Sequence, residues 1–244
     1  MVSSDNLVSC LCITHQRVPM LRRAVGCFLA QTWPERELVV LHEDTDHATR
    51  DFVAKLAHPL IRMHVVPASP HTTLGGKRRI SVDVARGRYV ATWDDDDWSA
   101  PTRLQQQIEG MRGVGQAVCT LERWIVHDQL LGQSWLSQAR TWEASLVAER
   151  AVMPRYEDGE RGTDRVSMDV LLAAGHVTAL RAPHLYIYVY HGGNVGPRAH
   201  FKRNVFAQST PLSPAFSRRV AALLASASEP AITPAELAAA LPVT

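Results

Sequence analysis

The sequence predicts an α/β fold, with one domain built on a mostly parallel central sheet that helices flank on both faces. Short apolar runs alternate with helical patterns through the first hundred residues, and polar residues directly follow several of these runs. Such an alternation implies right-handed crossovers between parallel strands. With 244 residues and 46% hydrophobic content, the chain can bury the core of one such domain and carry an appendage.

The first half of the chain supplies the alternation. Apolar and β-branched runs of four to eight residues indicate buried strands, and apolar residues at helical spacing indicate the intervening helices. Pro34 ends the first helical pattern, and Gly87 ends the third. We expect strands over residues 7–14, 37–41, 61–66 and 89–93, and helices over 19–31, 51–57 and 80–86.

The second half is less regular. Residues 128–140 and 156–161 show no clear period and are expected to form loops. Ser213-Pro214 and Thr233-Pro234 each place a capping residue before a first-turn proline, so two short Ala-rich helices should follow and pack on the domain or on a second subunit. We expect strands over residues 116–126, 142–147, 177–180 and 185–190, and helices over 101–111 and 166–174.

Four consecutive carboxylates, Asp94 to Asp97, follow the apolar run Tyr89 to Trp93. Neighbouring carboxylates repel one another, so a folded protein must offset them with a cation or with hydrogen-bond donors. Parallel sheets bind ligands beyond the carboxyl ends of their strands, which favours a divalent metal at this position. The alternative is a solvated acidic loop, or the start of the helix that Ser99 and Pro101 open.

Two other segments bear polar groups at comparable positions. The strand 37–41 runs into the acidic patch 42–46, and Gly75-Gly76 followed by Lys77, Arg78 and Arg79 precedes a helical pattern. A Gly-Gly turn and three cations at a helix N-terminus suit an anion, although an ordinary solvated helix start explains the same residues. The spacing is not that of a P-loop.

Composition and cysteine usage exclude some classes of protein. The 26 basic and 24 acidic residues nearly balance and form no basic block, so nucleic acid is not expected as an obligatory partner. Cys10, Cys12, Cys27 and Cys119 lack metal or disulfide spacing and are expected to be free thiols in a reducing cytosol. We expect neither a signal peptide nor a transmembrane segment, while peripheral association with the inner face of a membrane stays open.

Taken in order, several motifs resemble those of the family-2 glycosyltransferases, whose GT-A fold is Rossmann-like. The resemblance covers residues 7 to 205 and implies a nucleotide-binding half over about 1–100, an acceptor-side half over about 101–205 and an Ala/Pro-rich helical tail over 206–244. The tail would suit a homodimer contact. The motifs are the strand ending at Thr14, Ala30-Gln31-Thr32-Trp33-Pro34, the acidic end of the second strand, Gly75-Gly76-Lys77-Arg78-Arg79, Ala85 to Val90 leading into Asp94 to Trp98, and Ala174-Gly175 through Tyr186 to His191-Gly192-Gly193-Asn194.

The resemblance implies roles for the donor-side residues. His42 stands where the family often has its first aspartate, so the choice of base is open, and the donor expected is a UDP-type sugar. Asp94-x-Asp96 matches the D-x-D motif, with Asp96 and His191 as ligands of Mn²⁺ or Mg²⁺, for which hard oxygen ligands are suitable. The nucleotide sugar would contact Thr14, Glu43, Lys77, Arg78, Arg79, Asp94 and Asp95.

The same resemblance implies a catalytic base on the second half. Family members carry Glu-Asp before the helix that precedes Ala174-Gly175, and Thr163-Asp164 occupies that position, so the glutamate is absent. Asp164 is the expected base, with Asp169 as the alternative, and Trp142 and Glu143 are expected on the acceptor side. The implied activity is a metal-dependent, inverting, non-processive sugar transfer to an acceptor hydroxyl.

Two other functions stay open. An inactive relative that only binds a nucleotide sugar is consistent with the missing glutamate. A sugar nucleotidyltransferase would normally have a Gly-rich, Arg-containing loop after the first strand, where this chain has Thr14-His15-Gln16-Arg17. The sequence does not identify the acceptor.

Overall fold

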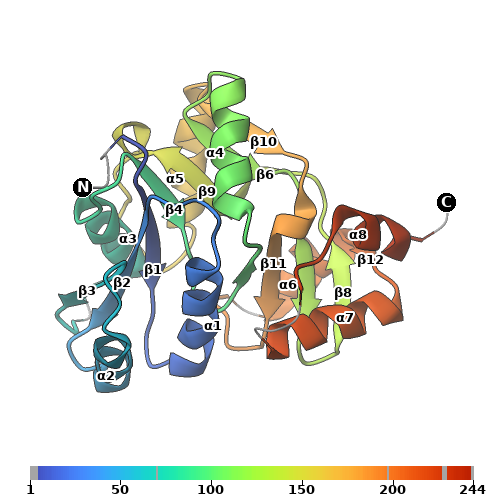
Figure 1. Cartoon of the computed structure of the whole chain (residues 1–244), viewed down its shortest axis with the longest axis horizontal. Helices are drawn as coiled ribbons and strands as arrows, with labels where there is room; N and C mark the ends of the chain where they lie inside the picture. The colour runs from blue at the N-terminus through green and yellow to red at the C-terminus, as the bar shows by residue number, and fades with distance from the viewer. Residues whose placement is uncertain (1–4, 70, 197, 227–229, 243–244) are drawn as a thin grey trace.

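The computed structural model describes residues 5–69, 71–196, 198–226 and 230–242, which form two β-sheets and their covering helices (Figure 1). The larger sheet has the order β10-β6-β9-β4-β1-β2-β3. All its neighbouring pairs are parallel except the two that β9 makes, with β4 and with β6. This confirms the predicted mostly parallel sheet. Its strands are β1 (Val8–Ile13), β2 (Arg36–Glu43), β3 (Ile61–Val66), β4 (Tyr89–Thr92), β6 (Val118–Leu121), β9 (Trp142–Glu149) and β10 (Val177–Leu180).

The second sheet has the order β12-β8-β7-β11-β5 and was not foreseen from the sequence. Only β7 and β11 run parallel, whereas its other three pairs are antiparallel. Its strand β5 directly follows the four aspartates, so the acidic run joins the two sheets. The strands are β5 (Trp98–Ser99), β7 (Ile125–Asp128), β8 (Gln133–Leu136), β11 (Tyr186–Tyr190) and β12 (Thr210–Pro211).

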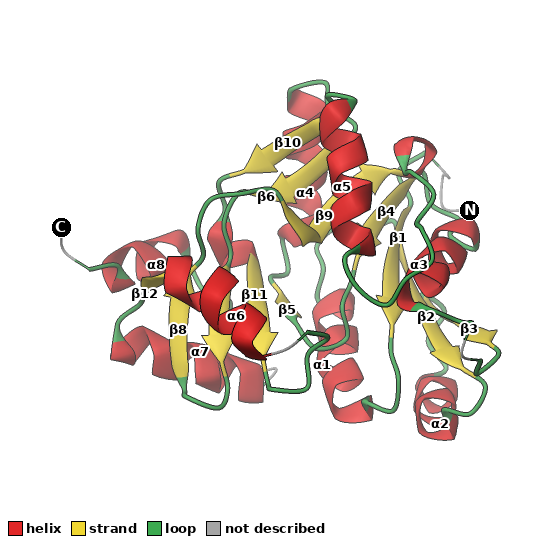
Figure 2. Ribbon diagram, turned by 180° about the vertical axis from the view of Figure 1, so that it is seen from behind, coloured by secondary structure: helices red, strands yellow, loops and turns green. Residues whose placement is uncertain are grey.

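Helices cover both faces of the larger sheet. In Figure 1, α1 and α4 lie in front of it, and in the opposite view of Figure 2, α3 and α5 lie in front. The α-helices are α1 (Val18–Leu29), α2 (His47–Leu56), α3 (Leu74–Asp83), α4 (Arg103–Gly113), α5 (Thr163–Ala173), α6 (Arg198–Asn204), α7 (Pro214–Ala225) and α8 (Pro234–Ala240), and 3₁₀-helices span Arg150–Val152, Pro183–Leu185 and Phe206–Gln208.

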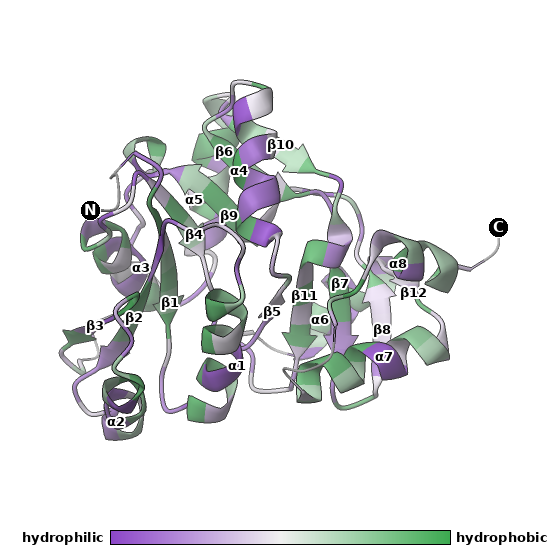
Figure 3. Ribbon diagram, in the orientation of Figure 1, coloured by the Kyte–Doolittle hydropathy of each residue, from purple (hydrophilic) through white to green (hydrophobic). Residues whose placement is uncertain are grey.

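This two-sided covering explains why β1 is apolar at every position except Ser9, and Figure 3 shows the strand mainly in the colour of hydrophobic residues. On one face Cys10 packs in the main core with Phe28 of α1, and on the other Leu11 packs with Met168 and Leu171 of α5. Fully burying a side chain of this size contributes about 1.5–3 kcal/mol, so the two layers hold the strand ends in place. All four cysteines are free thiols, as predicted, and the structure buries each of them.

The two predicted C-terminal helices are present and begin at the predicted prolines. Ser213 accepts a hydrogen bond from the backbone of Phe216, and Thr233 forms a capping box with Glu236. Phe216 and Val220 of α7 belong to the main core, so this part of the tail packs on the second sheet. Contact between two copies through residues 206–244 stays a prediction.

Several predicted elements were wrong in extent. The second helix, expected over 51–57, begins at His47, and the segment 128–140, expected to be a loop, contains β8. The segment 116–126 is not one strand, because its apolar halves are buried in different sheets as β6 and β7. The third helix begins at Leu74 and not at residue 80, since Gly75 and Gly76 lie in its first turn and Thr73 caps it. No helix in the described ranges is long and apolar enough to cross a membrane.

Candidate active site

A cavity of about 1100 Å³ opens beyond the carboxyl ends of β1, β2 and β4 and extends to the second sheet. It brings together most of the residues that the sequence singled out. Arg79, Asp169 and His191 do not line it, although His191 contacts a residue that does. The predicted residues in its wall are Thr14, Glu43, Lys77, Arg78, Asp94, Asp95, Asp96, Trp142, Glu143 and Asp164.

The end of β1 holds two of the four aspartates. The Thr14 hydroxyl donates to Asp95 over 2.6 Å across 81 positions of sequence. Arg17 forms ion pairs with Asp95 at 3.0 Å and with Asp96 at 3.1 Å. Arg17 was not among the predicted site residues, although its position just after the first strand could have indicated that it lies near the acidic run. The repulsion among the consecutive aspartates is therefore offset by hydrogen-bond donors of the protein as well as by any bound cation.

The aspartates differ in their electrostatic environment. Burial, together with the neighbouring Asp96, raises the pKa of Asp95 to about 7. Burial also acts on Asp96, but the hydrogen bond from His191 and the charge of Arg17 outweigh it, so the pKa of Asp96 is lowered. Asp96 is thus held as a carboxylate, the form that binds metal ions.

Asp97 has a structural contact that the sequence did not identify. Its carboxyl group accepts a hydrogen bond from the backbone N–H of Val189 at 2.8 Å and another from the Tyr186 hydroxyl. Burial raises its pKa well above the usual range. Asp97 therefore fixes the acidic run to β11 of the second sheet.

The end of β2 presents Glu43 to the cavity. Lys77 of α3 pairs with Glu43 at 2.6 Å, and His15 lies 3.5 Å from its other oxygen. His42 is buried, points its Nδ1 to the Glu43 carbonyl at 2.8 Å and does not line the cavity. A ligand that enters here therefore meets the Glu43–Lys77 pair and not His42.

Arg78 connects the two halves of the cavity. Its Nη2 donates to Asp94 at 3.0 Å, and its Nε lies 3.1 Å from Asp164 in the first turn of α5. The Arg78 side chain is only 9% exposed, whereas that of Asp164 is 33% exposed and open to the cavity. Arg78 therefore holds Asp164 near Asp94, the first of the carboxylates that follow β4.

Of the two interpretations of Gly75 and Gly76, the structure favours the ordinary helix start over the anion-binding turn. The Gly75 N–H donates to the Gly159 carbonyl at 2.8 Å, and the Gly76 N–H donates to the Thr73 hydroxyl at 3.1 Å. Both groups are therefore occupied within the protein. Arg79 likewise points away from the cavity, pairing with Asp158 at 3.0 Å.

Asp169, the alternative base, lies further along α5. It pairs with Arg165 at 2.9 Å, its side chain is 54% exposed, and it does not line the cavity. A helix of 3.6 residues per turn directs side chains five positions apart in different directions. Asp164 and Asp169 therefore cannot serve the same site.

Trp142 and Glu143, the residues expected on the acceptor side, belong to a longer row of side chains in contact with one another. The Arg140 guanidinium lies 4.2 Å over the Trp142 ring, and Trp142 stacks on Trp124 at 4.2 Å. Tyr188 continues the row, 5.2 Å from Trp124. Glu143 pairs with Arg140 at 2.6 Å. All five side chains line the cavity, and the sequence identified only Trp142 and Glu143 among them.

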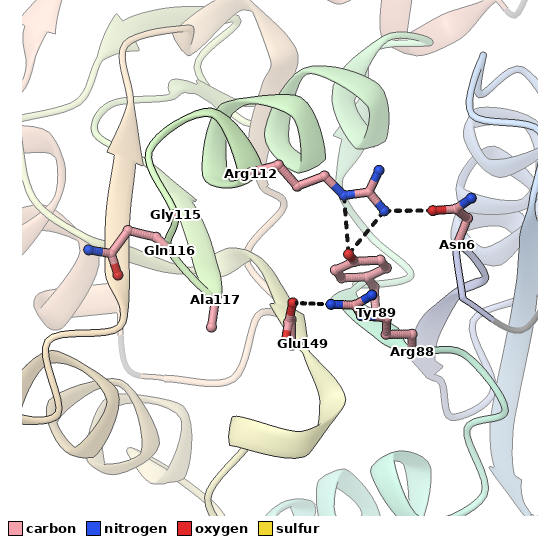
Figure 4. A pocket seen from close by; sticks show the side chains of 8 residues that line it. All are labelled: Asn6, Arg88, Tyr89, Arg112, Gly115, Gln116, Ala117 and Glu149. Carbon is pink, nitrogen blue, oxygen red and sulfur yellow. Dashed lines mark hydrogen bonds and ion pairs between the residues drawn. The ribbon is translucent and has the colours of Figure 1, made fainter.

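A second, smaller cavity of about 460 Å³ adjoins Tyr89, the first residue of β4, at the other end of that strand (Figure 4). Its polar groups satisfy one another. Arg112 donates to the Tyr89 hydroxyl and, at 2.7 Å, to Asn6, while Arg88 pairs with Glu149 at 2.9 Å. Among the described residues, Glu149 is the one carboxylate in its lining, so this cavity lacks the cluster of carboxylates that lines the larger one.

Comparison with known proteins agrees with this geometry. The model of Glycosyl transferase family 2 matches residues 9–163. The chain belongs to glycosyltransferase family 2. The match ends one residue before Asp164, so the positions of Asp164 and His191 rest on the structure rather than on the family model.

Two relatives of this family 2 member are named for the biosynthesis of succinoglycan and of teichuronic acid. Succinoglycan biosynthesis protein ExoO of Rhizobium meliloti (strain 1021) is 32% identical over 96 residues, which are 39% of this chain and 27% of ExoO. The putative teichuronic acid biosynthesis glycosyltransferase TuaG of Bacillus subtilis (strain 168) is 28% identical over 105 residues, or 43% of this chain and 42% of TuaG. The matched region spans less than half of either relative.

Solved structures show that the fold is that of GT-A glycosyltransferases. TarS of S. aureus, residues 1–349 in complex with UDP-GlcNAc, superposes with a TM-score of 0.60 at 15% identity, covering 90% of this chain and 72% of that one. The mannosyltransferase PcManGT of Pyrobaculum calidifontis, in complex with GDP-Man and Mn²⁺, gives 0.56 at 13% identity, covering 84% and 61%.

Proposed function

We propose that this protein is a metal-dependent, inverting, non-processive glycosyltransferase that moves a sugar from a UDP-type donor to an acceptor hydroxyl. The observation that carries the proposal is that carboxylates from both halves of the chain line one cavity. Asp94 and Asp96 follow β4, Asp164 lies in the first turn of α5, and Arg78 contacts both Asp94 and Asp164. Sugar transfer needs stabilisation of the leaving anion and a base for the acceptor hydroxyl, and this cavity offers residues for both.

The donor would lie against the nucleotide-binding half, residues 1–100. Support comes from TarS, which has been solved with UDP and with UDP-GlcNAc, and whose fold this chain shares. In the cavity wall there, Glu43, Asp94 and Asp95 would accept hydrogen bonds from the ribose hydroxyls and the nucleobase, and Thr14 lies beside Asp95. Lys77 and Arg78 would contact the diphosphate. Arg79 is left out of this proposal because it lies outside the cavity.

The residues present fit a bound Mn²⁺ or Mg²⁺. Asp96 lines the cavity, and its lowered pKa keeps it in the carboxylate form. His191 Nε2 lies 3.1 Å from Asp96 Oδ2. The described residues contain no cluster of three or more His, Cys, Asp or Glu suited to a metal, so the donor diphosphate would complete the ligand set. Proteins usually bind Mg²⁺ through one or two side-chain carboxylates, together with the phosphates of the substrate. When bound, the ion supplies charge neutralisation of the departing diphosphate.

Asp164 would act as the base. Its carboxylate accepts the proton of the acceptor hydroxyl as that oxygen forms a bond with the anomeric carbon. The bond to the diphosphate oxygen breaks on the opposite face of the sugar, so the anomeric configuration inverts. Trp142 and Glu143 in the acceptor-side half, residues 101–205, would hold the acceptor beside Asp164. Their stacked and paired neighbours keep both side chains in fixed rotamers.

Incubation with Mn²⁺ and a panel of nucleotide sugars tests the proposal. We expect slow hydrolysis of one donor without an acceptor and faster release of nucleoside diphosphate with one. Nucleotide binding without any turnover would instead identify an inactive binding relative, in line with the missing glutamate. Synthesis of a sugar nucleotide with release of pyrophosphate would identify a nucleotidyltransferase.

A further inference from the structure

The first turn of α3 is joined to the segment that leads into α5. Gly75 donates its N–H to the Gly159 carbonyl at 2.8 Å, and Gly159 donates its own N–H to the Thr73 hydroxyl at 3.2 Å. The contact is very close, since a Cβ on Gly75 would lie 1.9 Å from the Glu157 carbonyl oxygen and 2.9 Å from a methyl carbon of Thr163. Only glycine allows this approach.

The side chains that follow Gly75 extend the same junction. Arg79 pairs with Asp158 at 3.0 Å and donates to the Tyr156 carbonyl at 3.3 Å. Arg78 reaches Asp164 at 3.1 Å and Asp94 at 3.0 Å. Residues 73–79 therefore contact the segment 156–164 through backbone, hydroxyl and guanidinium groups.

The start of α5 depends on this junction because it has no side-chain cap of its own. Its N-cap residue is Gly162, in the left-handed conformation at φ 76°, and no side chain accepts from the first turn. Capping side chains normally fix the start of a helix. Here the first residues of α5, Thr163 and Asp164, lie against Gly75 and Arg78.

We propose that Gly75 is a positioning residue, and that the first turn of α3 sets the place of Asp164 relative to the donor site. The proposal rests on the proposed function, in which Asp164 is the base. A side chain at position 75 would push the segment 157–163 away and displace Asp164, while the carboxylates after β4 would keep their contacts with Thr14 and Arg17.

The substitution Gly75→Ala tests this role, with Gly26→Ala as its matched control. Gly26 also lies in a helix, and a Cβ there would have no atom within 4 Å. For Gly75→Ala we expect kcat of transfer to fall by about 10- to 100-fold, because a displacement of about 1 Å can cost that much. The donor KM and the affinity for UDP with Mn²⁺ should stay within about twofold of wild type. Gly26→Ala should leave all three unchanged.

Hydrogen–deuterium exchange gives a readout that does not depend on turnover. We expect Gly75→Ala to speed exchange of the amides of 157–163, including that of Gly159, and to leave 89–99 unchanged. Wild-type kcat in Gly75→Ala, or equal losses of UDP affinity and kcat, would overturn the positioning role. If the wild-type protein transfers no sugar from any donor, the proposed function fails. In that case the exchange experiment alone tests the contact between α3 and the segment 157–163, and unchanged exchange at 157–163 in Gly75→Ala would show that Gly75 does not hold that segment.

A second variant guards against misfolding of Gly75→Ala. Asp158→Asn weakens the contact with Arg79, and the Asp158 side chain is 65% exposed, so the fold should tolerate the change. We expect a fall in kcat of about two- to fivefold with an unchanged donor KM. A change in donor KM alone would contradict the positioning role.

Discussion

His191 Nε2 lies 3.1 Å from Asp96 Oδ2, although the two residues are 95 positions apart and follow strands of different sheets. For Asp96→Asn we expect loss of Mn²⁺-dependent turnover, because the amide lacks the charge that a divalent ion requires. For His191→Gln we expect a higher Mn²⁺ concentration at half-maximal activity, by about 10-fold or more. Titration of activity with Mn²⁺ measures both.

His71→Gln is the control for the histidine substitution, since His71 is exposed and does not line the cavity. It should keep the wild-type Mn²⁺ titration. If His191→Gln also kept that titration, His191 would only hold Asp96 by a hydrogen bond, and the metal would depend on Asp96 and the donor.

Asp164→Asn should separate binding from chemistry. We expect UDP binding to be nearly intact and transfer to fall by about 10²- to 10⁴-fold, the usual contribution of a general base. Asp169→Asn on the same helix should leave transfer unchanged, because Asp169 is outside the cavity and pairs with Arg165. Calorimetry with UDP and a single-turnover assay would measure the two effects. Full turnover of Asp164→Asn would show that the base is elsewhere.

Arg103 stabilises the junction of the two sheets. It is fully buried and donates to three uncharged acceptors, the Thr92 carbonyl, Ser99 and Gln107. Arg103→Met should lower the free energy of unfolding by about 2–4 kcal/mol, because these buried acceptors lose their donor. Urea denaturation measures the loss, and Arg50→Met on the exposed surface of α2 should change it little. If Arg103→Met and Arg50→Met lowered the free energy of unfolding by the same small amount, Arg103 would not stabilise the junction of the two sheets.

His127 should make stability depend on pH. Burial lowers its pKa from 6.5 to about 4. Between these values the unfolded chain binds a proton that the folded protein does not, so the stabilisation is present above pH 6.5 and lost as pH falls towards 4. The loss is at most about 3 kcal/mol. His127→Gln should flatten this part of the curve of Tm against pH. His47 is exposed, so His47→Gln should keep the wild-type dependence of Tm on pH. If His127→Gln also kept that dependence, His127 would not be its source.

The sequence predicted the first half of the fold because each buried parallel strand is a continuous apolar run bounded by turn residues. It failed where that rule does not apply. Strand β8, Gln133–Leu136, is partly polar and half-buried, and β5 has only two residues, so neither has a pattern to detect. The second sheet depends on pairings between distant segments, such as β11 with β5 and β7, which no local period encodes.

The candidate site divides in the same way. Asp94 to Asp96 and Glu43 were located correctly at strand ends, because the chemistry of consecutive carboxylates is visible locally. The surroundings of Arg79 could not be predicted, since its partner Asp158 is 79 positions away. The sequence left open whether Gly75 belongs to an anion-binding turn or to an ordinary helix start, because the close approach of Glu157 leaves no trace in the sequence around either residue.

The place of β9 in the larger sheet has a consequence for biosynthesis. During translation, β4 has β1 on one side and finds its other neighbour, β9, only when residues 142–149 have been made. A nascent or truncated chain that stops before residue 142 therefore exposes the backbone edge of Tyr89, Val90 and Ala91, which are apolar and prone to pair with other chains. Expression of the nucleotide-binding half alone should yield aggregated protein, whereas extension through β9 closes that edge.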